Sequence, residues 1–68
     1  MILQNRIRVL RAERRISQKE LADNVGLSRQ SVNSIELGKF NPSIVTAMKI
    51  ASYFGVSVED VFRLEEEK

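Results

Sequence analysis

Residues 17–38, SQKELADNVGLSRQSVNSIELG, decide the fold of this chain because they predict two short helices joined by a tight turn. Ser17 and Glu20 have the spacing of a capping box, in which the serine hydroxyl and the glutamate carboxylate each accept from a backbone N–H of the other residue. A helix is therefore expected over residues 18–25. Its apolar side chains form a narrow face, and Gly26 follows where a left-handed C-terminal cap is needed.

The second helix of the pair has too few apolar residues to be a core helix. Ser28 is its expected N-cap, the helix covers residues 29–37, and only Val32 and Ile35 are clearly inward. Its other side chains are mostly polar, namely Arg29, Gln30, Ser31, Asn33 and Ser34. Such side chains match the edges of bases in the major groove of DNA, where Arg pairs with guanine and Gln or Asn with adenine.

Six residues across this stretch have a spacing typical of a DNA-binding motif: Gln18, Ala22, Gly26, Val32, Ile35 and Glu36. The pattern resembles the helix-turn-helix of the phage-repressor and Cro-like (XRE) family of bacterial and archaeal regulators, and the similarity extends over about residues 5–62. A small residue at Ala22 lets the second helix cross close above the first, and Gly26 permits the left-handed turn. The resemblance implies a mainly α fold, a five-helix repressor-like DNA-binding domain.

Length and composition limit the alternatives. Sixty-eight residues suffice for one core, so we expect a single helix-turn-helix domain over residues 1–68. The chain has no Cys and no His, which excludes disulfides, thiolate zinc sites, thiol nucleophiles and imidazole bases, and we expect neither a metal nor a cofactor. The apolar runs are short and no signal peptide begins the chain, so we expect a soluble, cytoplasmic protein with no membrane partner.

Positive charge gathers in the first part of the chain. Residues 1–39 hold eight Lys or Arg against four acids, whereas residues 40–68 hold three against five. The predicted helix-turn-helix lies in the basic part, as phosphate binding requires. Taken singly, the arginines of the first helix are more simply a solvated helix face: Arg6, Arg8, Arg14 and Arg15. The asymmetry as a whole favours an anionic partner, double-stranded DNA.

The first helix is expected over about residues 6–15. Asn5 is a plausible N-cap, and Ile7, Leu10 and the stem of Arg14 form its inward stripe, with Val9 partly exposed. Members of the resembled family often carry glycine just before the position of Ile16. This chain has Arg15 there, so we expect a looser closing turn or strain at Arg15.

Two more helices follow a loop at residues 39–43. The first is expected over residues 44–54 with Asn41 or Ser43 as its cap, and the second over residues 58–62 with Ser57 and Asp60 as a capping pair. The inward stripe predicted for residues 44–54 is Ile44, Ala47, Met48, Ala51 and Phe54.

Both ends of the chain read as short strands, at about residues 2–4 and 62–65. Alternating apolar residues suit a strand after Phe62, and its natural partner is the apolar N-terminal segment. The two would form an antiparallel ribbon that joins the termini. The ribbon resembles that of a compact subgroup of short regulators in the family, which act as dimers. The alternative is a frayed N-terminus and a solvated acidic tail.

The resemblance also implies residue roles. The residues matching base-reading positions are Arg29, Gln30, Ser31 and Asn33, and those matching phosphate contacts are Gln18, Ser28, Lys39 and Asn41. Arg11 and Glu36 match a structural ion pair between the first helix and the end of the recognition helix. Candidates for a dimer interface are Ile50, Tyr53, Val58, Phe62 and Leu64.

The function implied is a sequence-specific transcriptional regulator, a repressor that binds a near-palindromic operator through the major groove as a homodimer. An antitoxin-like or other protein-interaction module with secondary DNA binding is the alternative, although the acidic tail is short for neutralising a toxin. An enzyme is disfavoured because adjacent carboxylates such as Glu59 and Asp60 share a helix end and do not face each other across a cleft. RNA binding lacks the aromatic stacking face it needs.

Overall fold

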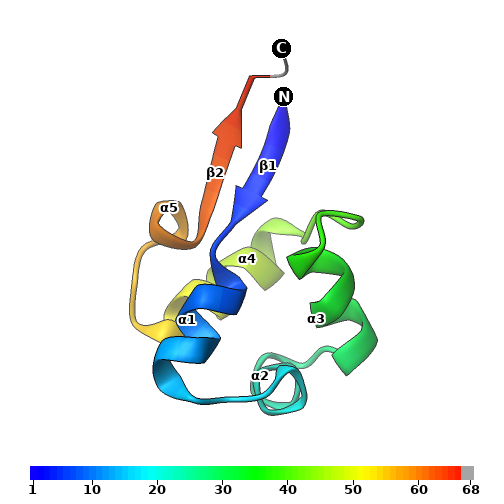
Figure 1. The fold of residues 1–68 in the computed structure, drawn as a ribbon, viewed down its shortest axis with the longest axis vertical. Helices are drawn as coiled ribbons and strands as arrows, with labels where there is room; N and C mark the ends of the chain where they lie inside the picture. The colour runs from blue at the N-terminus through cyan, green and yellow to red at the C-terminus, as the bar shows by residue number, and fades with distance from the viewer. Residues whose placement is uncertain (67–68) are drawn as a thin grey trace.

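Five helices and two short strands follow one another in the computed structural model, which describes residues 1–66 (Figure 1). Their bounds are β1 Ile2–Asn5, α1 Ile7–Arg14, α2 Gln18–Val25, α3 Arg29–Glu36, α4 Ile44–Phe54, α5 Val58–Val61 and β2 Phe62–Glu65. The predicted mainly α fold with five helices and a terminal ribbon is confirmed. The bounds differ from the predicted ones by no more than a residue at any end.

The core draws apolar side chains from every helix. It contains Ile7, Leu10, Leu21, Ala22, Val25, Val32, Ile35, Ala47, Ile50, Ala51, Phe54, Val61 and Phe62. The two inward residues predicted for α3 are both among them, so α3 rests on the core by a narrow apolar edge and leaves its other sides outward. Ala22 is almost fully buried, as expected for a small residue beneath a crossing helix.

Serine caps begin four of the helices. The side chains of Ser17, Ser28, Ser43 and Ser57 each accept a hydrogen bond from the backbone N–H three residues later. Each bond satisfies one of the free donors at a helix start, and replacing such a cap by alanine typically costs about 1 kcal/mol. The choice left open between Asn41 and Ser43 is thus settled for Ser43.

Two of the predicted caps differ in detail. Of the serine caps, only Ser57 forms the full capping box, because the Asp60 carboxylate also accepts from the Ser57 N–H at 3.1 Å. The reciprocal bond predicted for Glu20 is not among the hydrogen bonds of residues 1–66. Asn5 lies in β1 and Arg6 occupies the N-cap position of α1, yet the Asn5 side chain still accepts from the Ile7 N–H at 3.2 Å.

The end of α1 confirms strain at Arg15. Its φ of 57° and ψ of 42° are left-handed, and among residues 1–66 it is the one residue other than glycine with positive φ. This geometry closes α1 and lets the Ile16 N–H reach the Arg11 carbonyl at 3.1 Å. A side chain at such a position costs roughly 1–2 kcal/mol, which glycine avoids.

The inward face predicted for α4 is partly wrong. Ile44 and Met48 are 70% and 57% exposed, whereas Ile50 is fully buried and Ala47, Ala51 and Phe54 line the core as predicted. The helix is apolar around most of its circumference, so its residue pattern alone does not select a face. Contacts with α2 and α5 decide which side is buried.

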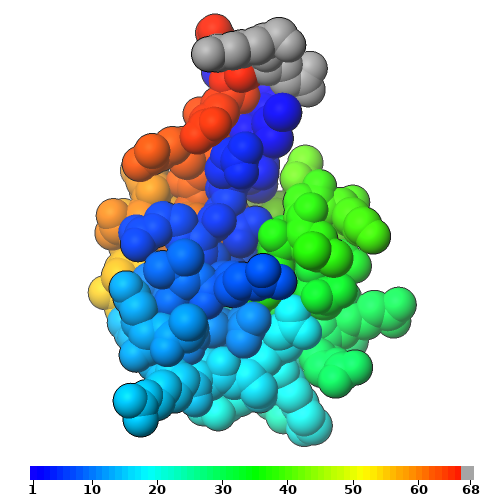
Figure 2. All heavy atoms as spheres, in the orientation of Figure 1, coloured from blue at the N-terminus to red at the C-terminus, as the bar shows by residue number. Residues whose placement is uncertain are grey.

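The ribbon projects from the helical body (Figures 1 and 2). Its strands are antiparallel, with Ile2 opposite Glu65, Leu3 opposite Leu64, Gln4 opposite Arg63 and Asn5 opposite Phe62. The Arg6 N–H donates to the Val61 carbonyl at 2.9 Å and joins the base of the ribbon to α5. The pairing confirms the predicted ribbon and rules out a frayed N-terminus.

Candidate nucleic-acid interface

Helix α3 lies along one side of the molecule, directly after the turn that ends α2 (Figure 1). Gly26 has φ of 75°, and the Leu27 N–H donates to the Ala22 carbonyl at 2.9 Å, so the chain reverses within three residues and starts α3 at Ser28. The side chains of Arg29, Gln30 and Asn33 are exposed. A polar row on a short helix after a sharp turn has the form of an element that fits the major groove.

The two serines within α3, Ser31 and Ser34, are half-buried. Ser28 both caps α3 and donates from its hydroxyl to Ser31 Oγ at 2.9 Å. The Ser31 hydroxyl proton therefore stays free to donate outward. Ser28 has already committed its hydroxyl to this local pair, which makes it first a cap.

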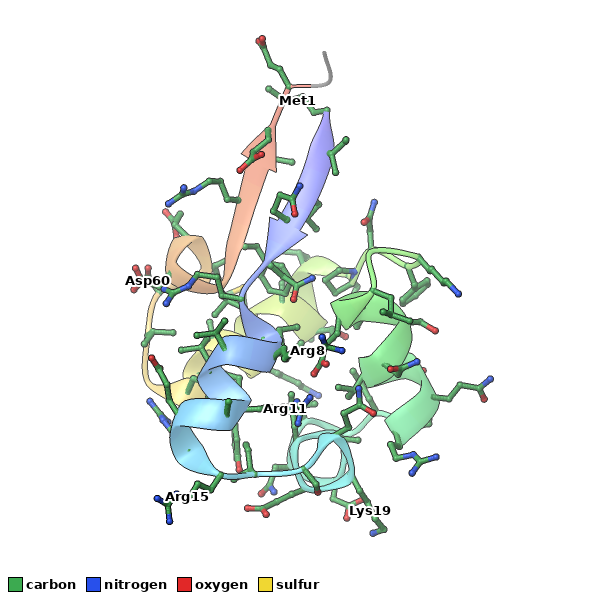
Figure 3. All side chains as sticks on the ribbon, in the orientation of Figure 1. Met1, Arg8, Arg11, Arg15, Lys19 and Asp60 are labelled. Atoms are coloured by element: carbon green, nitrogen blue, oxygen red, sulfur yellow. The ribbon has the colours of Figure 1, made fainter. Side chains whose placement is uncertain are left out.

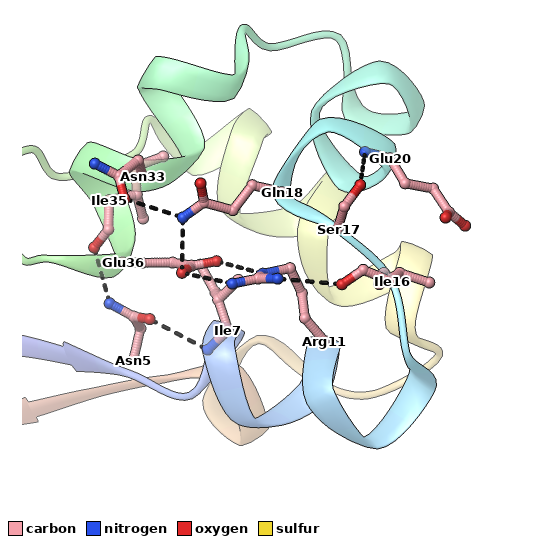
Figure 4. A network of polar contacts seen from close by, with 10 residues as sticks. All are labelled: Asn5, Ile7, Arg11, Ile16, Ser17, Gln18, Glu20, Asn33, Ile35 and Glu36. Carbon is pink, nitrogen blue, oxygen red and sulfur yellow. Dashed lines mark hydrogen bonds and ion pairs between the residues drawn. The ribbon is translucent and has the colours of Figure 1, made fainter.

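The end of α3 is held by an ion pair with α1 (Figure 4). Arg11 donates from Nε to Glu36 Oε2 at 2.6 Å and from Nη2 to Oε1 at 3.0 Å, while its Nη1 donates to the Ile16 carbonyl at 3.1 Å. The Glu36 side chain is only 2% exposed and that of Arg11 16%. Hydrogen bonding to Glu36 raises the pKa of Arg11 above its usual value. The forked pair fixes the position of α3 relative to α1.

Gln18 extends this network to the exposed face of α3 (Figure 4). Its Nε2 donates to Glu36 Oε1 at 3.2 Å and to Asn33 Oδ1 at 3.0 Å. A carboxylate can only accept, so Glu36 requires the amide nitrogen of Gln18 to face it, and the second proton of that nitrogen then orients Asn33. The side-chain nitrogen of Gln18, a residue predicted to contact phosphate, is thus engaged within the protein. The backbone N–H of Gln18 is one of the first in α2, and such groups have no partner within their own helix.

The loop after α3 contributes a further exposed group. Gly38 has φ of 76°, and the Lys39 N–H donates to the Ser34 carbonyl at 2.9 Å, so the loop folds back against the end of α3. The side chains of Lys39, Phe40 and Asn41 are exposed. Lys39 and Asn41 therefore flank Phe40 in an exposed loop that lies close to the end of α3.

A shallow hollow separates this loop from α3. It is lined by Gln30, Ser31 and Ser34 of the helix and by Phe40 of the loop. A larger hollow lies elsewhere, between the ribbon and α5, and has side chains of both charges around it, including Arg6, Glu59 and Arg63. Mixed charge gives that second hollow no preference for an anion.

Two polar contacts between elements have no signal in the sequence. Arg14 donates to the Phe54 carbonyl, and its guanidinium lies 5.4 Å from the centre of the Phe54 ring, so it closes the end of α4. Asn5 Nδ2 donates to the Ile35 carbonyl at 2.9 Å and connects the ribbon to the last turn of α3. Arg14 therefore has a structural role. Two other basic residues, Arg15 and Lys19, lie at the end of the molecule opposite the ribbon (Figure 3).

A recognition helix with a polar outer row, supported by a short helix across a glycine turn, defines the helix-turn-helix class of DNA-binding proteins. Comparison with known families agrees. Residues 7–61 match the family model HTH_3, described as helix-turn-helix, and the chain belongs to this family, the XRE family of regulators.

Several proteins similar in sequence to this chain are named as transcriptional regulators or repressors. The chain is 45% identical over 65 residues to an uncharacterized HTH-type transcriptional regulator, YgzD, of Bacillus subtilis, covering 96% of this chain and 98% of that protein. It is 41% identical over 66 residues to an uncharacterized HTH-type transcriptional regulator of Methanocaldococcus jannaschii, covering 97% of this chain and all of that protein. The immunity repressor of Bacillus phage phi105 is 34% identical over 61 residues, covering 90% of this chain and 42% of the repressor.

Solved structures show the same architecture. A putative DNA-binding protein from Bacteroides fragilis superposes with a TM-score of 0.81 at 26% identity, covering 91% of this chain and all of that one. The restriction-modification controller protein C.AhdI from Aeromonas hydrophila gives a TM-score of 0.75 at 34% identity, covering 81% of this chain and 80% of that one. The chain is therefore a transcriptional regulator with a helix-turn-helix DNA-binding domain, in a family of regulators and not of enzymes.

Two further properties of residues 1–66 concern membranes and metal ions. None of their helices combines the length and the apolar character that crossing a bilayer demands. The same residues contain no group of three or more acidic side chains placed to hold a metal ion.

Proposed function

We propose that this protein is a repressor that binds a near-palindromic operator as a homodimer, with the α3 helices of the two protomers in successive major grooves about 34 Å apart. The observation that carries the proposal is the outer row of α3 on a fixed support. Bases are read by Arg29, Gln30, Ser31 and Asn33, and phosphates are contacted by Gln18, Ser28, Lys39 and Asn41.

The support for α3 favours reading of sequence over loose attachment to DNA. Arg11, Glu36 and Gln18 form one chain of hydrogen bonds that ends on the Asn33 amide. Asn33 is therefore oriented before DNA arrives, and less conformational entropy is lost when it meets a base edge. Gln18 contributes its backbone N–H to phosphate binding, because a helix start offers free donors to an anion.

The homodimer is supported by apolar surface that the monomer does not use. Ile44, Val45 and Met48 are 70%, 59% and 57% exposed and share one side of α4, beside a buried face on the same helix. Leu64 of the ribbon is also largely exposed. A helix that is apolar nearly all round is normally covered on both sides, and large exposed apolar patches mark interfaces. A second copy of this chain is the occupant we propose.

Repression requires only that the protein occupy its operator. The relatives named as repressors support repression over activation. The phage phi105 relative is an immunity repressor, and a Vibrio cholerae relative is a cryptic-phage transcriptional repressor, 32% identical over 57 residues. A dimer that covers successive major grooves also covers the DNA between them, which excludes other proteins from that site.

Selection of bound fragments from a random DNA pool tests base reading. The wild type should enrich one near-palindromic sequence. Gln30→Ala should weaken binding to that sequence by roughly 1–3 kcal/mol per half-site and relax the choice at one base pair in each, because each protomer loses a bidentate pair to a base. Gln4→Ala, an exposed glutamine on the ribbon, is the matched control and should bind as the wild type does. Equal losses on selected and random DNA for Gln30→Ala would remove it from the reading residues.

Phosphate contact gives a different response to mutation. Lys39→Ala should weaken binding to all sequences alike and reduce the slope of log affinity against log salt by about two units, because the dimer loses one phosphate contact in each protomer and releases two fewer counterions. Titration of selected and random duplexes over a range of salt concentrations measures both effects. A change of base preference in Lys39→Ala would contradict the assigned role.

A further inference from the structure

Phe40 is the aromatic residue that the fold does not bury. Its side chain is 55% exposed, whereas Phe54 and Phe62 lie in the core and Tyr53 packs against it. Phe40 lies in the loop after α3 and forms one wall of the hollow whose other wall is Gln30, Ser31 and Ser34. Leaving an aromatic ring in water forgoes favourable burial, so the position calls for a partner that covers it.

The two walls of this hollow differ in chemistry. The helix wall carries an amide and two hydroxyls, while the loop wall is a hydrocarbon ring. Ser34 is short, so space remains between the helix and the ring that a longer side chain would fill. A ligand that fits must place a small apolar group against the ring and polar groups against Gln30 and the serines.

The hollow is continuous with the reading face proposed above, since Gln30 and Ser31 belong to both. Among the groups that base pairs display in the major groove, the apolar one is the 5-methyl group of thymine. We propose that Phe40 and Ser34 form a subsite for a thymine methyl group, and that Phe40 is therefore a specificity-determining residue. This inference rests on the proposed function, because it requires α3 to enter the major groove.

Gln30 completes the recognition of that base pair. Gln30 lines the hollow and is exposed, so its amide can pair with the N7 and N6 groups of an adenine while the methyl group of a thymine in the same or the adjoining pair enters the hollow. The subsite thus adds to readout by hydrogen bonds. It distinguishes thymine from cytosine by an apolar group that cytosine lacks.

Uracil scanning of the selected operator tests the subsite. Uracil has the same hydrogen-bonding edge as thymine and lacks only the methyl group, so each thymine is replaced singly by deoxyuridine. With wild-type protein, one position in each half-site should lose affinity about three- to fivefold per methyl group, the effect of burying one carbon. Phe40→Ala should bind the thymine and uracil operators equally.

Two further variants keep the test decisive. Phe40→Leu retains an apolar wall and should keep part of the discrimination, whereas Val9→Ala, an exposed apolar residue of α1, should keep all of it. Circular dichroism and sedimentation check that each variant is folded and assembled as the wild type is.

The possible failures can be told apart. Failure to enrich any sequence from the random pool would refute the proposed function. The subsite alone would be overturned if an operator is enriched but replacing its thymines by uracil lowers the affinity of the wild type and of Phe40→Ala by the same amount at every position. The subsite would also be overturned if Phe40→Ala lost the same affinity relative to the wild type on both operators and so still preferred thymine. The ring would then pack against the sugar-phosphate strand.

Discussion

Glu36 is the residue on which the presentation of α3 depends. Its carboxylate is nearly inaccessible to solvent and accepts from two nitrogens of Arg11 and from Gln18. A buried charge that keeps its partners is tolerated, whereas the same charge without them is strongly destabilising. The ion pair therefore makes the fold sensitive to changes at Arg11, a residue outside the reading row.

Arg11→Ala should lower the free energy of unfolding by about 3 kcal/mol, because it leaves the Glu36 carboxylate buried without its cation. Urea denaturation followed by circular dichroism measures the change. Arg8→Ala, an exposed arginine of the same helix, should stay within about 0.5 kcal/mol of the wild type. A loss for Arg11→Ala no larger than this control would show that the pair adds nothing to stability.

Arg15→Gly should stabilise the protein by about 1 kcal/mol, since glycine adopts the positive φ at this position without the penalty of a side chain. Thermal unfolding should show a melting temperature higher by roughly 4–8 °C. The control is Ala12→Gly, at an exposed position with helical geometry three residues earlier, which should destabilise by about 1 kcal/mol. A stability decrease for Arg15→Gly would mean that the arginine side chain offsets its own strain.

At the scale of single elements, the serine caps made most of the helices predictable. A cap is a local feature, since Ser17, Ser28, Ser43 and Ser57 each bond a donor three residues away. The buried side of α4 was not predictable in the same way. Ile44 and Ile50 are both apolar, and only the position of neighbouring helices determines that Ile50 enters the core.

The candidate site divides along the same line. The polar row of α3 follows from residue types and spacing within a few positions, and strain at Arg15 was expected from the glycine that the resembled family often carries there. The bond from Gln18 to Asn33 joins residues 15 apart, and that from Asn5 to Ile35 joins residues 30 apart. Such contacts depend on how whole helices are placed relative to one another, so no local sequence pattern predicts them. Phe40 was visible only as one of few aromatic residues, and the hollow beside it required coordinates.

The start of α5 makes one cap sensitive to acid. Hydrogen bonds from the side chain and backbone of Ser57 lower the pKa of Asp60 below its usual value. A carboxyl group with a lower pKa in the folded state contributes stability above its unfolded pKa of about 4, and this contribution is lost as the pH falls through the folded value.

Asp60→Asn should therefore be less stable than the wild type at pH 7, and the difference should shrink when both are measured near pH 2.5. Urea denaturation at the two pH values measures it. Glu59→Gln, the neighbouring carboxylate outside the capping box, should show a smaller dependence on pH. A difference that is the same at both pH values would show that the charge of Asp60 does not contribute.

At the scale of the whole molecule, the exposed side of α4 corrects the predicted interface. Ile50 and Phe62 were interface candidates, but both lie in the core, and Leu64 is the candidate that is largely exposed. Tyr53 and Val58 are partly buried against the core. In the proposed homodimer, the residues that α4 leaves exposed, Ile44, Val45 and Met48, replace the buried candidates.

Sedimentation should give a mass near twice 7.8 kDa at micromolar concentration. Met48→Glu should shift this mass to that of the monomer, because a charge would be buried in an apolar interface. Val9→Glu adds the same charge at an exposed apolar position of α1, away from this face of α4, and should remain dimeric. A monomeric wild type, or loss of the dimer in both variants, would contradict the assignment of this surface.

The pairing of β1 with β2 has a consequence for how the protein is made. Ile2–Asn5 is synthesised well before its partner Phe62–Glu65, so at usual rates of translation the first strand waits roughly 3 to 12 seconds for the second. Through that interval the nascent helices can begin to associate, but neither Phe62 nor the ribbon is in place. The native state therefore cannot be completed until the second strand has been synthesised and can pair with the first.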